Sequence, residues 1–358
     1  ALFAGLWAMQ TSVLTGLQRF DLVFLANSLA AAVMVLGAAF LPMTPRDPSS
    51  TFLIMGAGCG VAFMVGVLPI QRLSRPDAGA AERLDNGSII RYCTNVWVTA
   101  LLWSLVWSRG EVPLVRHMLG DVQLANYTVA LSLVGGAIAG VMLGVGGIAP
   151  QATRLLGEGR MIEAVMLCRR VGDWQILLSG GAAALLIWLA PELLRISFGP
   201  AYTSSVPALS LLAAGLPALS FSMHNHLLQI RTGARFNRNA TLMGLGVLGV
   251  AAIVLIPRFG IEGAAIARVS TLCLLAVVSA AVFSSDTGPG PAGVNRIGFA
   301  TVMLVTAASA VTVAFFPSAP IGIRGVLALA IILAFSLIVR DADGRLVVKL
   351  MAKRGLRS

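Results

Sequence analysis

Polar and charged side chains interrupt several long apolar stretches of this sequence, and these are the residues that could do chemistry. They are Arg109, Glu111, His224, Asn225, His226, Gln229 and Arg268. Polar groups inside a membrane-crossing run usually face the interior of a helical bundle or a water-filled cavity. Arginine there attracts anions, and histidine and amide groups hydrogen-bond to hydroxyl or phosphate oxygens. We therefore predict that these residues line a polar cavity that binds substrate.

Each of these residues also has a plainer explanation. The triplet His224–His226 could serve only for hydrogen bonding between helices. Arg109 and Glu111 could lie in an outer loop if the preceding helix ends at Trp107. Arg268 could reach outward to lipid headgroups. These alternatives remain open at the level of sequence.

Enzyme chemistry and metal binding are not indicated. Histidines two residues apart on a helix point to nearly opposite faces, and no third ligand accompanies His224 and His226. The four cysteines are far apart and behave as small apolar side chains. No catalytic triad, paired catalytic carboxylates or phosphate-binding loop is visible, so we expect neither an enzyme nor a bound cofactor.

The composition is typical of a membrane protein. Hydrophobic residues make up 57% of the chain and charged residues 11%, with a mean hydropathy of +0.87, whereas soluble domains carry about 25% charged residues. The net charge of +11 could suggest nucleic-acid binding, but the arginines lie in short connections between apolar runs. We predict an all-α, polytopic transmembrane helical bundle.

About eleven apolar runs are long enough to be membrane spans, given that roughly 20 residues cross the hydrocarbon core as a helix. They cover residues 1–15, 20–42, 51–71, 89–117, 122–149, 170–190, 203–230, 239–256, 262–284, 297–316 and 322–340. If alternate connections share a side, 19 of the 26 basic residues lie on one side and five on the other. The positive-inside rule then places the carboxyl terminus in the cytoplasm.

The chain divides into two predicted helical bundles. Residues 1–71 form the remainder of a first bundle with three spans, and residues 72–88 form a cytoplasmic linker. Residues 89–284 form a second bundle of six spans. Residues 285–340 add two more spans, and residues 341–358 form a basic cytoplasmic tail.

Two glycine patterns fall inside predicted spans. Gly136, Gly140 and Gly144 form a small-residue stripe, which favours close helix packing or, alternatively, a hinge. Gly244, Gly246 and Gly249 match a dinucleotide-binding pattern, but that pattern requires a preceding strand. We interpret the second set as helix packing as well.

Several blocks, in order, resemble the bacterial polysaccharide (O-antigen-type) flippases of the multidrug/oligosaccharidyl-lipid/polysaccharide exporter superfamily. The blocks are Gly16–Phe20, Arg109–Glu111 with Leu119-Gly120 and Asn126-Tyr127, Pro150–Arg154, Phe198–Tyr202, Thr232-Gly233, and Ile256–Ala265. The resemblance implies twelve to fourteen helices in two bundles around a central cavity. It also implies that the first helices of the family fold are missing before residue 1.

What the resemblance implies about function is transport in the bacterial inner membrane. The expected substrate is a polyprenyl-diphosphate-linked oligosaccharide used for polysaccharide or lipopolysaccharide biosynthesis, moved by alternating access. Arg109 and Arg268 would attract the diphosphate, and His224, Asn225, His226 and Gln229 would hydrogen-bond to sugar or phosphate. Glu111 would bind a coupling proton or sodium ion, or pair with Arg109.

The expected partners are membrane lipids and the glycan polymerase and glycosyltransferases of the same pathway. Two alternatives stand beside the flippase. One is a drug/cation antiporter of the same superfamily, which would favour acids inside the bundle. The other, less favoured, is a multi-span glycan polymerase or acyltransferase, which usually needs a large outer loop or catalytic His and Asp residues at the membrane face.

Overall fold

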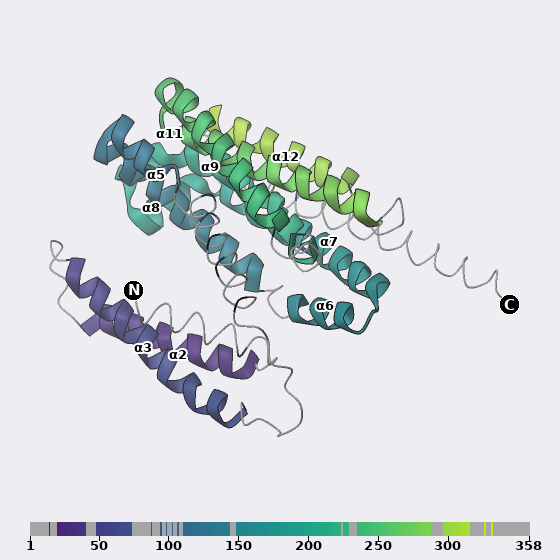
Figure 1. Ribbon diagram of the computed structural model, residues 1–358. Coiled ribbons are helices and arrows are strands. Elements are labelled where there is room, and N and C mark those ends of the chain that lie inside the picture. Colours follow the sequence, from purple (N-terminus) through teal and green to yellow (C-terminus); the bar gives the residue numbers. More distant parts are fainter. Residues whose placement is uncertain are drawn as a thin grey trace. The chain divides into compact units, whose positions relative to one another are not determined.

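The computed structural model (Figure 1) describes most of the chain and confirms that its class is all-helical. The described residues are 20–40, 48–73, 110–143, 148–222, 225–228, 235–287 and 296–315, with a few isolated positions besides. Among these residues there is no strand. The chain divides into two units, Ala1–Asp85 and Asn86–Ser358, and the boundary falls within residues 72–88.

The first unit contains a pair of antiparallel helices, α2 (Phe20–Phe40) and α3 (Pro48–Leu73). Gly37 packs against Ile54, and Gly58 packs against Met34 and the Ala30 carbonyl. The numbering falls in one helix as it rises in the other, so the helices run in opposite directions. They coincide with the predicted spans 20–42 and 51–71, whereas nearly all of the predicted span 1–15 lies outside the described residues.

The second unit is built around a helix that is interrupted. Around it lie α5 (Val112–Leu143), α7 (Met161–Trp188), α11 (Arg235–Thr287) and α12 (Arg296–Phe315). The central stretch consists of the 3₁₀ segment η2 (Pro200–Ser205), α9 (Val206–Ala214) and the 3₁₀ segment η3 (Leu216–Phe221). Of its apolar window 83% is buried, against 28% for α5 and for α11. Two short helices, α6 (Ile148–Gly157) and α8 (Ala190–Phe198), lie at the two ends of α7.

Two glycines break long helices where the sequence predicts a boundary between spans. Gly120 in α5 has φ 82° and Gly260 in α11 has φ 60°. This backbone region favours glycine because glycine has no Cβ. The breaks separate the predicted spans 89–117 and 122–149, and 239–256 and 262–284. A straight helix as long as α11 would extend about 80 Å, far more than the roughly 30 Å hydrocarbon core.

The two halves of α11 fold back on one another at Gly260. Gly244 packs against Leu275, with 3.0 Å between the position of an added Cβ and the Leu275 Cδ1 atom. Gly260 is almost midway between them in sequence, and next to the turn a Cβ at Gly263 would overlap the Leu255 carbonyl oxygen. The α11 helix is therefore a tight antiparallel hairpin.

The sequence predicts one helical span over residues 203–230, but the structure interrupts it. Pro217 has no backbone N–H to continue an α-helix, and after α9 the Ala218 N–H donates to the Gly215 carbonyl in a 3₁₀ pattern. The Ala214 carbonyl is left without its usual α-helical donor. The Thr306 hydroxyl of α12 lies 3.4 Å from this carbonyl, and it lies closer, at 2.9 Å, to the Val302 carbonyl of its own helix. Broken helices of this kind occur at functional positions in membrane proteins.

Four helical stretches among the described residues are long and apolar enough to cross a membrane: Val112–Met142, Met161–Trp188, Pro200–Phe221 and Phe236–Val282. The last of these contains the hairpin at Gly260. Residues 21–37 and 53–65 are shorter apolar helices. This content is that of a membrane-embedded helical protein. The count of eleven spans depends partly on residues outside the described ranges.

The glycine stripe of α5 does not pack closely within the described residues. An added Cβ at Gly136 or Gly140 would meet no atom within 4 Å, and Gly144 lies outside the described ranges. In the second glycine pattern, Gly244 is a packing contact, whereas Gly246 and Gly249 have open space beside them.

Candidate functional site

A buried cluster of Glu111, Tyr127 and Arg268 joins the α5 region to α11. Arg268 Nη1 donates to Glu111 Oε1 at 2.5 Å, and Tyr127 Oη donates to the same oxygen at 2.7 Å. The side chains of Glu111 and Arg268 are 0% and 7% exposed, and Tyr127 is fully buried. Glu111 therefore lies inside the protein, and Arg268 points to Glu111 and not toward lipid headgroups.

The helix breaks explain why these three residues meet. Glu111 lies nine residues before Gly120 and Tyr127 seven residues after it, and Arg268 lies eight residues after Gly260. With a rise of about 1.5 Å per residue, each side chain is about 10–14 Å from the break in its own helix. The α5 and α11 hairpins, which turn at Gly120 and Gly260, pack side by side. The three residues therefore lie at a similar distance from the two turns and can meet.

The second carboxylate oxygen of Glu111 is also buried. Among the described residues, Glu111 Oε2 has no hydrogen-bond partner. Buried polar atoms are nearly always satisfied by protein or by ordered water. The open position at Oε2 is therefore suited to a small hydrogen-bonding species such as water or a proton.

The interrupted helix packs against the helix that carries Arg268. An added Cβ at Gly215, which lies between α9 and η3, would come 2.9 Å from the Val269 side chain. Val269 is the neighbour of Arg268 in the chain, so a shift at the α9–η3 break would press on the helix that carries Arg268.

A second polar layer lies further along α11 and involves α6 and α7. Ser279 Oγ donates to Asn225 Oδ1 at 2.6 Å, and Thr153 Oγ1 lies 3.4 Å from His226 Nε2. Gln175 of α7 and Ser222 exchange hydrogen bonds at 2.9 and 3.2 Å. These contacts connect α6, α7 and α11 to the segment 222–228.

The two layers are separate. Ser279 follows Arg268 by eleven residues in α11. At the helical rise per residue, this separation corresponds to about 16 Å along the helix. The sequence predicts one cavity shared by Glu111, Arg268 and the triplet 224–226, but the described members form two layers. Arg109, His224 and Gln229 lie outside the described residues.

One hollow in the structure involves none of these residues. It is an open apolar groove of about 450 Å³ along the first half of α11, lined by Gly246, Val247, Val250, Ala251, Val254 and Leu255. Its lining can contact hydrocarbon but offers no polar side chain to a charged substrate.

The sequence analysis assigns no site role to Tyr127 and Asp173. Tyr127 appears there only within the block Asn126-Tyr127, and its contact with Glu111 depends on how the chain folds back at Gly120. Asp173 is a buried acid in α7 with 6% of its surface exposed, and it has an interaction partner. The available signal is an acid inside the predicted apolar run 170–190.

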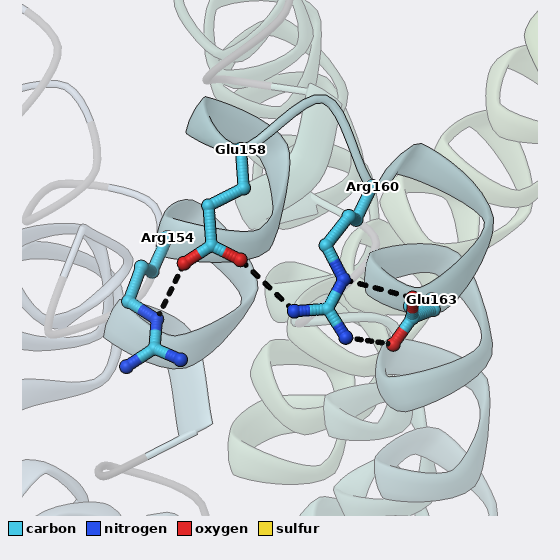
Figure 2. Close-up of polar contacts among 4 residues, drawn as sticks. All are labelled: Arg154, Glu158, Arg160 and Glu163. Atoms are coloured by element: carbon cyan, nitrogen blue, oxygen red, sulfur yellow. Dashed lines mark hydrogen bonds and ion pairs between the residues drawn. The ribbon is translucent and has the colours of Figure 1, made fainter.

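A charged network crosses the turn between α6 and α7 (Figure 2). Glu158 pairs with Arg154 and with Arg160, each at 3.0 Å, and Arg160 forms two hydrogen bonds with Glu163 at 2.6 and 2.8 Å. The carboxylates of Glu163 and Glu158 raise the pKa of Arg160 above its ordinary value. All four side chains are substantially exposed, so the network is a surface feature of the turn.

Among the described residues, no group of three or more His, Cys, Asp or Glu side chains is placed to hold a metal ion. No protein-family model matches the chain, and no curated protein matches it.

Proposed function

We propose that this protein is a membrane transporter of the polysaccharide-flippase type. Its substrate would be a polyprenyl-diphosphate-linked oligosaccharide, moved across the bacterial inner membrane by alternating access with the carboxyl terminus in the cytoplasm. The observation that carries the proposal is the buried ion pair between Glu111 and Arg268, inside a helical unit that is otherwise strongly apolar. Charges at such positions are costly and usually mark a substrate or ion pathway.

The physical problem is to bring a diphosphate and many hydroxyl groups through hydrocarbon. An arginine inside the bundle supplies a permanent positive charge with paired donors that suit phosphate oxygens. Asn225 and His226, with Gln175 and Ser222 close by in the second layer, would offer hydrogen bonds to sugar hydroxyls. Arg109, His224 and Gln229 keep the roles predicted for them from the sequence.

The interrupted helix supports alternating access. Transporters commonly use discontinuous helices at their binding sites, since broken segments can shift against their neighbours. Here the break at Gly215 and Pro217 contacts the helix of Arg268 through Val269. A movement of η3 against α9 would therefore reach the ion pair.

The drug/cation antiporter remains the second candidate because of Asp173. A cation carrier needs acids inside the bundle, and the described residues contain two that are buried, Glu111 and Asp173. The flippase is preferred since Glu111 is already neutralised by Arg268. Loss of drug resistance on Asp173→Asn substitution, with surface glycan unchanged, would favour the antiporter.

The test is surface-glycan production by bacteria that depend on this protein in its full length. Arg268→Ala should abolish or strongly reduce surface glycan at matched expression. Arg116→Ala is the control, because Arg116 pairs with Asp121 in an exposed position. Normal glycan in the Arg268→Ala cells would contradict the proposal.

A further inference from the structure

The Glu111 carboxylate occupies one of the Arg268 donors that an anion would need. Arg268 Nη1 is directed at Glu111 Oε1, and the arginine is only 6% exposed. A phosphate oxygen that accepts from Arg268 Nη1 must therefore displace the carboxylate from this donor. If the carboxylate stayed ionised, it would remain as an uncompensated buried charge next to the phosphate, which is strongly unfavourable.

A proton removes this conflict. It can reside on Glu111 Oε2, the buried oxygen without a described partner. The neutral carboxyl group then no longer forms an ion pair with the Arg268 guanidinium. A metal cation fits less well, because hard cations gather several oxygen ligands. The described side chains that contact Glu111 offer one further oxygen, from Tyr127, and a positive charge, from Arg268.

We propose that Glu111 and the diphosphate of the substrate compete for Arg268, so that protonation of Glu111 and binding of the diphosphate promote one another. One proton passes from water to Glu111 Oε2, the ion pair separates, and the guanidinium turns to the phosphate oxygens. This inference rests on the proposed function and specifies how its anion site is controlled.

Among the described residues, other titratable groups lie on elements packed against α5 and α11, including the buried Asp173 of α7. Arg268 faces Glu111 from α11, and Tyr127 faces it from α5. Arg116 and His117 lie in the exposed part of α5, and α8, which packs against α7, α9 and η2, carries Glu192 and Arg195. Within their described ranges, η2, α9 and η3 contain no charged residue.

The experiment measures binding of farnesyl diphosphate to the purified full-length protein in detergent, between about pH 5 and about pH 9. The wild type is compared with Glu111→Gln, which mimics the protonated carboxyl. At each pH we compare the two variants by the ratio of their dissociation constants. Protonation of the probe affects both constants equally and therefore does not change this ratio. We expect the wild type to lose affinity relative to Glu111→Gln as pH rises, by up to roughly tenfold per pH unit, the limit for one linked proton.

The matched control is Glu163→Gln, since Glu163 also pairs with an arginine but at the exposed α6–α7 turn. Its pH profile should follow that of the wild type. If Glu111→Gln is poorly folded, calorimetry of the wild type in buffers of different ionisation enthalpy gives the same answer. Uptake of about one proton per probe bound is then expected.

The outcomes separate the two proposals. A constant ratio across pH, with no proton uptake, would overturn the competition while leaving the anion site in place. Failure of the probe to bind to the wild type and to Glu111→Gln at every pH would overturn both the competition and the anion site on which the proposed function depends.

Discussion

Glu111 and Arg268 are separated by 157 positions in the chain and form a buried ion pair. The pair exists because two helical hairpins, which turn at Gly120 and Gly260, pack against each other. The helical rise places both residues about 12–14 Å from the turns. Tyr127 adds a second donor to the same carboxylate oxygen. The proposed function depends on this pair.

The buried ion pair predicts strong non-additivity in stability. Arg268→Gln alone leaves a buried, unpaired carboxylate and should destabilise the protein by roughly 3–5 kcal/mol. The double variant Glu111→Gln with Arg268→Gln should be more stable than Arg268→Gln, because no buried charge is left. Denaturation midpoints of the purified variants in detergent measure both effects, and purely additive losses would show that the pair is not formed.

The α11 hairpin predicts a disulfide crosslink. In a background without native cysteines, Gly244→Cys with Leu275→Cys should crosslink on mild oxidation in membranes, since Gly244 packs directly against Leu275. Gly246→Cys with Leu275→Cys is the control, because Gly246 faces open space. A shift in gel mobility reports the crosslink. Absence of the shift in the first pair would contradict the hairpin.

The tight turn of that hairpin predicts a position that tolerates no side chain. Gly263→Ala should lower stability by roughly 1–3 kcal/mol, because its Cβ would overlap the Leu255 carbonyl oxygen. Gly249→Ala should change stability little, as an added Cβ there meets nothing within 4 Å. Thermal melting of the two variants, followed by size-exclusion chromatography, compares them, and equal melting temperatures would refute the close contact.

The positive-inside assignment predicts which turns are accessible from outside the cell. Asp121→Cys, beside the Gly120 break, should react with a membrane-impermeant maleimide in intact spheroplasts. Glu158→Cys, at the α6–α7 turn, should react only after the membrane is opened. Both side chains are exposed at the protein surface, so burial cannot explain a difference. The reverse pattern would invert the orientation.

Much of the fold could be predicted from sequence, because hydropathy and helix-breaking residues act locally. The breaks at Gly120 and Gly260 lie between the predicted spans, where polar residues or proline accompany glycine. The break near Pro217 is not predicted, because hydropathy ignores the missing N–H of proline and the surrounding residues are mostly apolar.

The candidate site was less predictable because its contacts are long-range. Sequence reasoning selected Glu111 and Arg268 as polar residues in apolar runs but considered Arg109 as the partner of Glu111. Only the packing of α5 on α11 brings Arg268 to Glu111. Among the described residues, Asn225 contacts Ser279, which lies about 16 Å from Arg268 along α11, and His226 contacts Thr153. That these residues share one cavity with the ion pair stays a prediction.

The central claim is that Arg268 binds the diphosphate of a lipid-linked substrate during transport, in competition with Glu111. Its most direct test is transport of a fluorescent polyprenyl-diphosphate sugar by the full-length protein reconstituted in liposomes. The fluorescence that remains protected from an external quencher reports the transport. We predict rapid movement with the wild type and with Arg116→Gln, and little movement with Arg268→Gln. Transport by Arg268→Gln at the wild-type rate would contradict the account.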